Sequence, residues 1–221
     1  MFEKNEVPPH IIRIEKYTTE SKCVYGLKFY DFHYKKETDT PNILMLGDSH
    51  IRNGDWTHLL NREDVINRGI SGDNTECICV RLEYLKGIHA KIWFINGGIN
   101  DLPWKSPAFV FKNYQTIIEF AKNEGAIPVI NLLLYTSPLA AVNYPTRANY
   151  MKINSMVKET NTMLIAYAKA NNVDYIDLNK VTADHNDVFK AEYTTDGVHL
   201  TNDVYKEWAV LIQEVLTKYK I

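Results

Sequence analysis

The sequence of 221 residues predicts a parallel α/β protein. From residue 42 onward, short apolar runs rich in β-branched residues alternate with longer segments of helical period, which is the pattern of repeated βαβ units. The short runs are almost continuously apolar, as strands covered by helices on both faces must be. We therefore expect one α/β domain over residues 41–221, preceded by an extension over residues 1–40.

Residues 1–40 follow a different pattern. The spacing Ile12-x-Ile14 and a partial alternation over residues 28–34 favour a β-hairpin or an added edge strand. The aromatic side chains of this segment are expected to pack against the domain rather than to hold a sugar or a partner.

Five strands and several helices are predicted in the domain. The strands cover residues 43–46, 65–67, 91–96, 127–133 and 173–177. A helix over residues 109–123 ends at Gly125, which can take the left-handed conformation that closes a helix. Shorter helices are expected to begin near His50 and near Thr75. Two further helices carry apolar stripes, formed by Ile153, Met156, Val157, Leu164, Tyr167 and Ala168, and by Val204, Trp208, Leu211, Val215 and Tyr219.

Composition narrows the range of functions. The apolar content of 45% is enough for one full core, and a net charge of −2 provides no basic field for a nucleic-acid partner. Residues 1–14 contain charges and prolines but no apolar run, so neither a signal peptide nor a membrane span is expected. As written, the chain is expected to be cytoplasmic and to make no integral membrane contact. A secreted or periplasmic protein whose signal peptide had been removed would look the same.

The three cysteines lack the spacing of a redox or zinc pair. Cys77 and Cys79 are separated by one residue, and Cys23 makes the number odd. We expect reduced thiols, with Cys77 and Cys79 acting as small buried hydrophobes on the helix near Thr75.

Polar residues follow the predicted strands at the edge where ligands of parallel sheets bind. Ser49 follows the first strand, Gly69 the second and Asn100 the third, and the turn from Asp196 to His199 comes after the fifth. A serine hydroxyl becomes a nucleophile when an imidazole takes its proton and a carboxylate orients that imidazole. Ser49, His199 and Asp196 supply these three groups.

The same edge supplies donors for an oxyanion. The backbone N–H of Ser49, the N–H of Gly69 and the amide NH₂ of Asn100 are candidates, and one such donor stabilises a transition state by about 2.7 to 4 kcal/mol. This set of groups needs neither a metal ion nor a cofactor. Asp48 and Asp101 are interpreted as local hydrogen-bond acceptors that hold the loops.

These blocks resemble the SGNH hydrolase family, also called GDSL esterases and lipases. The matching residues are Gly47-Asp48-Ser49, Gly69, Gly98-x-Asn100-Asp101 and Asp196-x-x-His199, in the family's order over residues 42–221. The resemblance implies a flavodoxin-like three-layer α/β/α sandwich with five parallel strands in the order 2-1-3-4-5. It also implies ester or thioester hydrolysis through an acyl-enzyme, with Ser49, His199 and Asp196 as the triad. His50 departs from the aliphatic residue that usually follows the serine.

The expected partner is a small-molecule ester, with a short acyl group such as acetyl on a carbohydrate as the favoured substrate. Aromatic and basic side chains in two loops are suited to stacking on a polyol or hydrogen-bonding to it. The candidate substrate-binding residues are His50, Trp104, Tyr135 and Arg147, with Tyr144 and Tyr150 beside them.

Other functions stay open at this point. A lysophospholipase or thioesterase would use the same triad, and an O-acyltransferase would resolve the acyl-enzyme with an alcohol. An inactive carbohydrate-binding module is disfavoured because the triad residues are all present. In a metal-dependent phosphoryl enzyme, Asp48, Asp101, Asp196 and His199 would converge on a cation.

Overall fold

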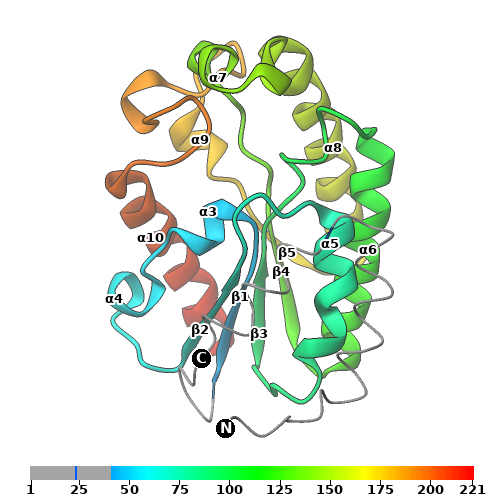
Figure 1. The fold of residues 1–221 in the computed structure, drawn as a ribbon. Helices are drawn as coiled ribbons and strands as arrows, with labels where there is room; N and C mark the ends of the chain where they lie inside the picture. Colours follow the sequence, from blue (N-terminus) through cyan, green and yellow to red (C-terminus); the bar gives the residue numbers. More distant parts are fainter. Residues whose placement is uncertain (1–22, 24–40) are drawn as a thin grey trace, which may run out of the picture.

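The computed structural model describes Cys23 and residues 41–221, and it confirms the predicted fold class. Five parallel strands form one sheet in the order β2-β1-β3-β4-β5 (Figure 1). The strands are β1 (Ile43–Gly47), β2 (Val65–Gly69), β3 (Ile92–Ile95), β4 (Ile127–Asn131) and β5 (Asp174–Ile176).

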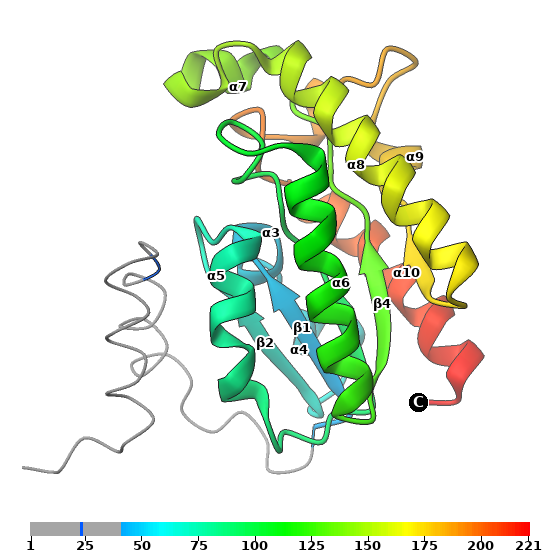
Figure 2. The same cartoon turned by 90° about the vertical axis from the view of Figure 1, so that its right-hand side faces the viewer.

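Helices cover the sheet on both faces and complete a three-layer sandwich (Figures 1 and 2). One face is covered by α5 (Thr75–Val80), α6 (Pro107–Asn123) and α8 (Tyr150–Ala170), and the other by α4 (Trp56–Leu60) and α10 (Asn202–Tyr219). The predicted helical stripes face the core. Ile153, Val157, Leu164, Ala168, Val204 and Trp208 are buried, and the other predicted stripe residues are partly buried against the core. Buried side chains of the strands and of both helical layers form one core.

Short elements carry the loops at the carboxyl ends of the strands. They are α3 (Ser49–Arg52), α7 (Pro138–Asn143), α9 (Asn179–Thr182) and the 3₁₀ turns η2 (Pro145–Arg147) and η3 (Ala191–Tyr193). A further 3₁₀ turn, η1 (Arg81–Leu85), continues α5 toward the start of β3. Helix α6 begins after Ser106, whose side chain accepts from the Phe109 N–H, and it is followed by Gly125 at φ +77°.

The strand ends differ slightly from the sequence prediction. Strand β2 runs two residues beyond the predicted end, to Gly69, because it pairs with β1 up to Gly47. Strand β4 stops at Asn131, before the predicted end at residue 133. Its neighbouring strand β5 ends at Ile176, whose carbonyl accepts the last hydrogen bond between the two strands, from the Leu132 N–H.

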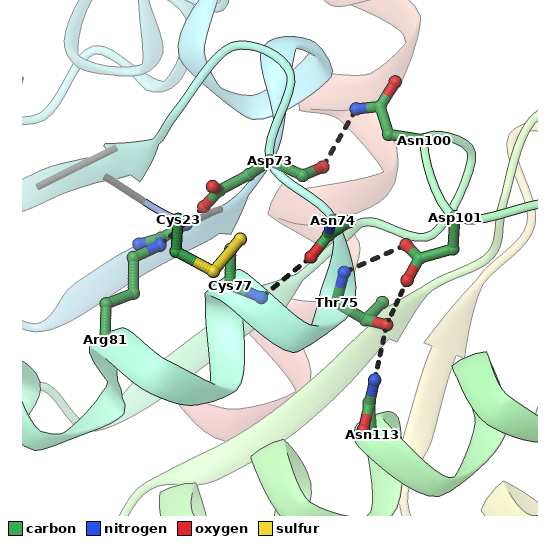
Figure 3. Close-up of a disulfide and its surroundings, with 9 residues drawn as sticks. All are labelled: Cys23, Asp73, Asn74, Thr75, Cys77, Arg81, Asn100, Asp101 and Asn113. Atoms are coloured by element: carbon green, nitrogen blue, oxygen red, sulfur yellow. Dashed lines mark hydrogen bonds and ion pairs between the residues drawn. A yellow bond between two sulfur atoms is a disulfide. The ribbon is translucent and has the colours of Figure 1, made fainter. Parts of the chain in front are cut away.

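The prediction of three reduced thiols is wrong for two of them. Cys23 and Cys77 form a disulfide, with their Cα atoms 5.3 Å apart, and Cys79 is the free cysteine (Figure 3). The partners are 54 residues apart, so local spacing gave no sign of the pair. Cys79 is reduced as predicted but only partly buried, and burial raises the pKa of its thiol to about 12.

The hairpin or edge strand predicted for residues 1–40 lies outside the described residues. Within the described part of the chain, no helix combines the length and the apolar character needed to cross a bilayer.

Candidate active site

Ser49 is the first residue of α3, directly after strand β1. Asp48 caps the helix by accepting a hydrogen bond from the His50 N–H at 2.9 Å. A side chain at Gly47 would place its Cβ 2.2 Å from the Asn96 carbonyl oxygen, so glycine allows the strand to turn closely past β3. No described residue accepts a hydrogen bond from the Ser49 N–H.

Ser49, His199 and Asp196 meet as the sequence predicted. Ser49 Oγ lies 2.9 Å from His199 Nε2, and His199 Nδ1 lies 2.6 Å from Asp196 Oδ2. A carboxylate only accepts, so Nδ1 carries the ring proton and the lone pair of Nε2 faces the serine hydroxyl. In this tautomer His199 can take the proton of Ser49.

Four hydrogen bonds keep the Asp196 carboxylate ionised. Its Oδ1 accepts from the backbone N–H groups of Val198 and His199 at 2.9 and 2.8 Å, while Oδ2 accepts from His199 Nδ1 and from the Tyr144 hydroxyl at 2.6 Å. Partial burial raises the pKa of Asp196, but these donors outweigh burial and hold the pKa well below its usual value.

Tyr144 belongs to the triad's surroundings, although the sequence suggested it as a contact for a polyol. Its hydroxyl donates to Asp196 and lies 3.4 Å from His199 Nδ1. Gly197, at φ +93°, allows α7 to pack closely against the loop of Asp196 and His199. A Cβ at this position would lie 2.1 Å from the Ala140 backbone nitrogen in α7. The aromatic residues of this loop indicated a functional role for Tyr144, but the sequence did not predict that its partner is Asp196.

Asn100 lies in the loop after β3 and is held at both ends of its amide. Nδ2 donates to the Asp73 carbonyl at 2.9 Å, and Oδ1 accepts from Arg147 Nη2 at 2.9 Å (Figure 3 shows the Asp73 contact). An amide NH₂ has two hydrogens, so one remains for a ligand.

Asp101 and Asp48 accept local hydrogen bonds, as the sequence suggested. Asp101 accepts from both the backbone N–H and the hydroxyl of Thr75, at 2.9 and 2.8 Å, and so fixes the first turn of α5 (Figure 3). Burial raises the pKa of Asp101 to about 6. Among the described residues, no group of three or more histidine, cysteine or acidic side chains is arranged to hold a metal ion.

Gly69 does not offer its N–H in the predicted way. It is buried and donates to Asn67 Oδ1 at 2.9 Å, and a Cβ at this position would lie 2.2 Å from the Arg52 backbone nitrogen. Glycine is therefore needed here for close packing of β2 against α3. Three residues later Gly72 is exposed, has φ +80°, and donates its N–H to no described residue. The next residue, Asp73, receives the bond from Asn100.

The sequence predicted that His50 lines the substrate pocket, but the structure buries its side chain. It is 2% exposed, and its Nε2 donates to the Val198 carbonyl at 2.9 Å. Successive helical residues point in different directions, so Ser49 faces the site while His50 turns inward and holds the loop that carries His199. The rings of His50 and His199 have centroids 6.0 Å apart.

The other candidates for substrate binding have different surroundings. Tyr135 is buried, and the described contacts of this residue are to Asn179 and Asp187 rather than to the triad. Trp104 is 73% exposed and lines a hollow of about 400 Å³. The other lining residues are Leu102, Pro103, Lys105, Ser106, Thr146, Asn149, Lys152, Ile153 and Met156. Leu102 and Thr146 are close in sequence to Asn100 and Arg147, but none of Ser49, Asn100, Arg147, Asp196 and His199 lines this hollow.

Comparison with known proteins gives one family and one fold. The sequence model of the GDSL-like lipase/acylhydrolase family matches residues 40–207. A GDSL-like lipase from Bacteroides thetaiotaomicron is similar in structure, with a TM-score of 0.72 and 21% identity over 93% of this chain and 98% of that chain. The aryl esterase of M. smegmatis gives a TM-score of 0.66 at 15% identity, over 81% and 99% of the two chains. An acetyl xylan esterase gives 0.61 at 18% identity, over 79% and 98%. A comparison with curated proteins found no match.

Proposed function

Because the chain belongs to the GDSL-like lipase/acylhydrolase family, we propose that it hydrolyses carboxylic esters with Ser49 as the nucleophile. One observation carries this proposal. Ser49 Oγ, His199 and Asp196 form a continuous chain of hydrogen bonds of 2.9 and 2.6 Å at the carboxyl ends of the strands.

In the first half of the reaction, Ser49 Oγ attacks the acyl carbon while His199 Nε2 takes the serine proton. The carbonyl oxygen becomes an oxyanion, which the Ser49 N–H and the free amide hydrogen of Asn100 stabilise. We assign the third donor to Gly72 in place of Gly69, because the Gly69 N–H is already bonded to Asn67. The tetrahedral intermediate then breaks its bond to the leaving alkoxide, which takes the proton from His199 and departs as an alcohol.

In the second half, water attacks the acyl-serine and gives a proton to His199. The resulting intermediate collapses, the carboxylic acid leaves, and Ser49 recovers its proton from His199. An alcohol in place of water would turn the same cycle into acyl transfer.

We further propose that the alcohol part of the substrate is a carbohydrate that contacts Trp104 in the hollow that this side chain lines. An exposed tryptophan beside lysine, serine, threonine and asparagine side chains is suited to stacking against a sugar ring. The structural neighbours include an acetyl xylan esterase, which agrees with an acetyl ester on a sugar. At 18% identity, the similarity to that esterase supports a shared fold.

The mechanism is tested by labelling with a fluorophosphonate and by assay of p-nitrophenyl esters from acetyl to dodecanoyl. We expect an adduct on Ser49 and loss of turnover by several orders of magnitude in Ser49→Ala and His199→Ala, with full activity in excess chelator. A folded protein that forms no adduct would instead be a binding module. Activity that is lost with chelator and kept in Ser49→Ala would indicate metal chemistry.

The substrate is tested by comparing an acetylated xylooligosaccharide with p-nitrophenyl acetate. Trp104→Ala should raise KM for the sugar ester about tenfold and leave p-nitrophenyl acetate within twofold, because the small ester does not reach the tryptophan. Equal effects on both esters, or a preference for dodecanoyl esters, would remove the carbohydrate assignment. The product mixture, free acid or acylated acceptor, distinguishes hydrolysis from transfer.

A further inference from the structure

We infer that Arg147 is a positioning residue for the oxyanion hole, holding Asn100 in its donating orientation and polarising its amide. This inference rests on the proposed function. Arg147 comes from the turn η2, far in sequence from Asn100, and its Nη2 donates to Asn100 Oδ1 at 2.9 Å.

The orientation of the Asn100 amide follows from its two contacts. Arg147 has only donors, so the atom that faces it must be the amide oxygen. The Asp73 carbonyl only accepts, so the atom that faces it must be the amide nitrogen. Rotating the amide by 180° would break both bonds. The pair therefore keeps the NH₂ group, rather than the oxygen, available to an oxyanion.

The charge of Arg147 acts on the same group. The side chain is only 6% exposed, and no carboxylate of the described residues forms an ion pair with it. A buried guanidinium without a direct counterion withdraws electron density from an amide oxygen that it contacts, which makes the NH₂ hydrogens stronger donors. The Arg147 cation would also stabilise the negative charge that develops beside Asn100 in the transition state.

Neighbouring groups explain how the cation is kept in place. The guanidinium carbon lies 5.5 Å from the centroid of the Tyr144 ring, within the range of a cation–π contact. Burial lowers the pKa of Arg147, and Asp48 and Asp196 act in the opposite direction from a distance. Nε of Arg147 is buried without a partner among the described residues. Residues Tyr144 and Arg147 thus connect the two halves of the site, since one contacts Asp196 and the other contacts Asn100.

The experiment measures kcat and KM for p-nitrophenyl acetate in Arg147→Gln, Arg147→Lys and Asn100→Ala, and in the double variant Arg147→Gln/Asn100→Ala. Arg147→Gln should lower kcat roughly 10- to 100-fold with KM within about threefold, since a charge-assisted bond that acts on the transition state is lost. Arg147→Lys keeps the charge and should recover part of kcat. In the Asn100→Ala background, Arg147→Gln should have less than a twofold further effect, because its target is gone.

A second measurement does not depend on turnover. A trifluoromethyl ketone forms a hemiketal oxyanion on Ser49, and Arg147→Gln should weaken its inhibition by the same factor as kcat/KM. Arg62→Gln makes the same change of charge before β2, at the opposite end of the sheet, and should leave all these values unchanged. Thermal unfolding of each variant shows whether the protein remains folded.

Three outcomes would overturn the inference. Arg147→Gln could keep kcat within twofold, raise KM alone, or lower kcat equally with and without Asn100. The second outcome would make Arg147 a substrate contact, and the third would make its effect independent of the amide. All three are distinct from failure of the proposed function, in which Ser49→Ala itself would retain activity.

Discussion

The Tyr144 hydroxyl gives Asp196 Oδ2 a second hydrogen-bond donor beside His199 Nδ1. Both the phenol and His199 Nδ1 contact Oδ2 at 2.6 Å, so the same carboxylate oxygen serves both donors. Partial burial and the bond to Asp196 raise the pKa of Tyr144 to about 12, so the hydroxyl remains a donor throughout the neutral range. Tyr144 thereby fixes the orientation of Asp196 but reduces the negative charge that the carboxylate offers to protonated His199.

Replacing Tyr144 by phenylalanine should change the pH profile as well as the rate. We expect kcat/KM at neutral pH to fall roughly tenfold, because one bond to a charged group that positions Asp196 is lost. The acid limb of the profile should move to higher pH, since protonated His199 then has the full charge of Asp196. Rates measured between pH 5 and pH 9 check both effects.

The chain offers a matched control for this substitution. The Tyr219 hydroxyl donates to Asp174 Oδ2 at 2.7 Å, away from the triad, so Tyr219→Phe removes the same kind of bond. It should leave the pH profile unchanged. An acid limb that stays in place in Tyr144→Phe would contradict the role assigned to the phenol.

At the scale of elements, the first turn of α5 joins the disulfide to the active-site loops. Cys77 binds Cys23, the Asn74 side chain caps the Cys77 N–H, and Asp73 and Thr75 contact Asn100 and Asp101 (Figure 3). Residues 73–77, at the start of this short helix, therefore link the disulfide to Asn100 and Asp101. A disulfide persists in oxidising compartments, so we propose such a compartment in place of the cytoplasm expected from the sequence.

Counting thiols tests the disulfide directly. The denatured, unreduced protein should react with one equivalent of a thiol reagent, from Cys79, and with three after reduction. Cys77→Ser should lower the free energy of unfolding by roughly 2 to 4 kcal/mol, because the crosslink no longer restricts the unfolded chain. Cys79→Ser should keep the disulfide and show no thiol before reduction. Three thiols in the untreated protein would contradict the pairing.

At the scale of the whole molecule, two carboxylates make the free energy of unfolding depend on pH in opposite directions. The pKa of Asp196 is lowered by folding, so its contribution is present above the ordinary range of an aspartate and is lost as pH falls. The pKa of Asp101 is raised to about 6, so the folded state holds this proton more tightly than the unfolded chain. The contribution of Asp101 therefore declines as pH rises from about 4 to about 6, and it is constant above that range.

Urea unfolding of the wild type and of Asp101→Asn at pH 4.5 and pH 7 isolates this contribution. The variant should be less stable at both pH values, because an amide replaces a carboxylate that accepts from Thr75. It should also lack a decrease on the order of 2 kcal/mol that Asp101 causes in the wild type between these pH values. Parallel pH dependences in the two proteins would show that Asp101 does not titrate there.

The sequence predicted the sheet and the meeting of Ser49, His199 and Asp196 because both depend on local patterns. Continuous apolar runs marked the five strands, and Ser49 and His199 each lie at a turn whose residues are recognisable in isolation. The partners of His50, Tyr144 and Cys77 lie between 52 and 148 residues away, and no periodicity specifies such contacts. Gly69 was misassigned because a glycine that permits close packing and one that exposes an N–H look alike in a sequence.

In the proposed mechanism, the base and one contact beside the nucleophile both come from the last part of the chain. His199 lies three residues before α10, and Tyr205 in α10 donates to the His50 carbonyl at 2.8 Å, beside the nucleophile. In the proposed mechanism Ser49 needs His199, which follows it by 150 residues in the chain. A nascent chain that ends before residue 199 therefore lacks the base for its serine, and we expect it to leave esters intact.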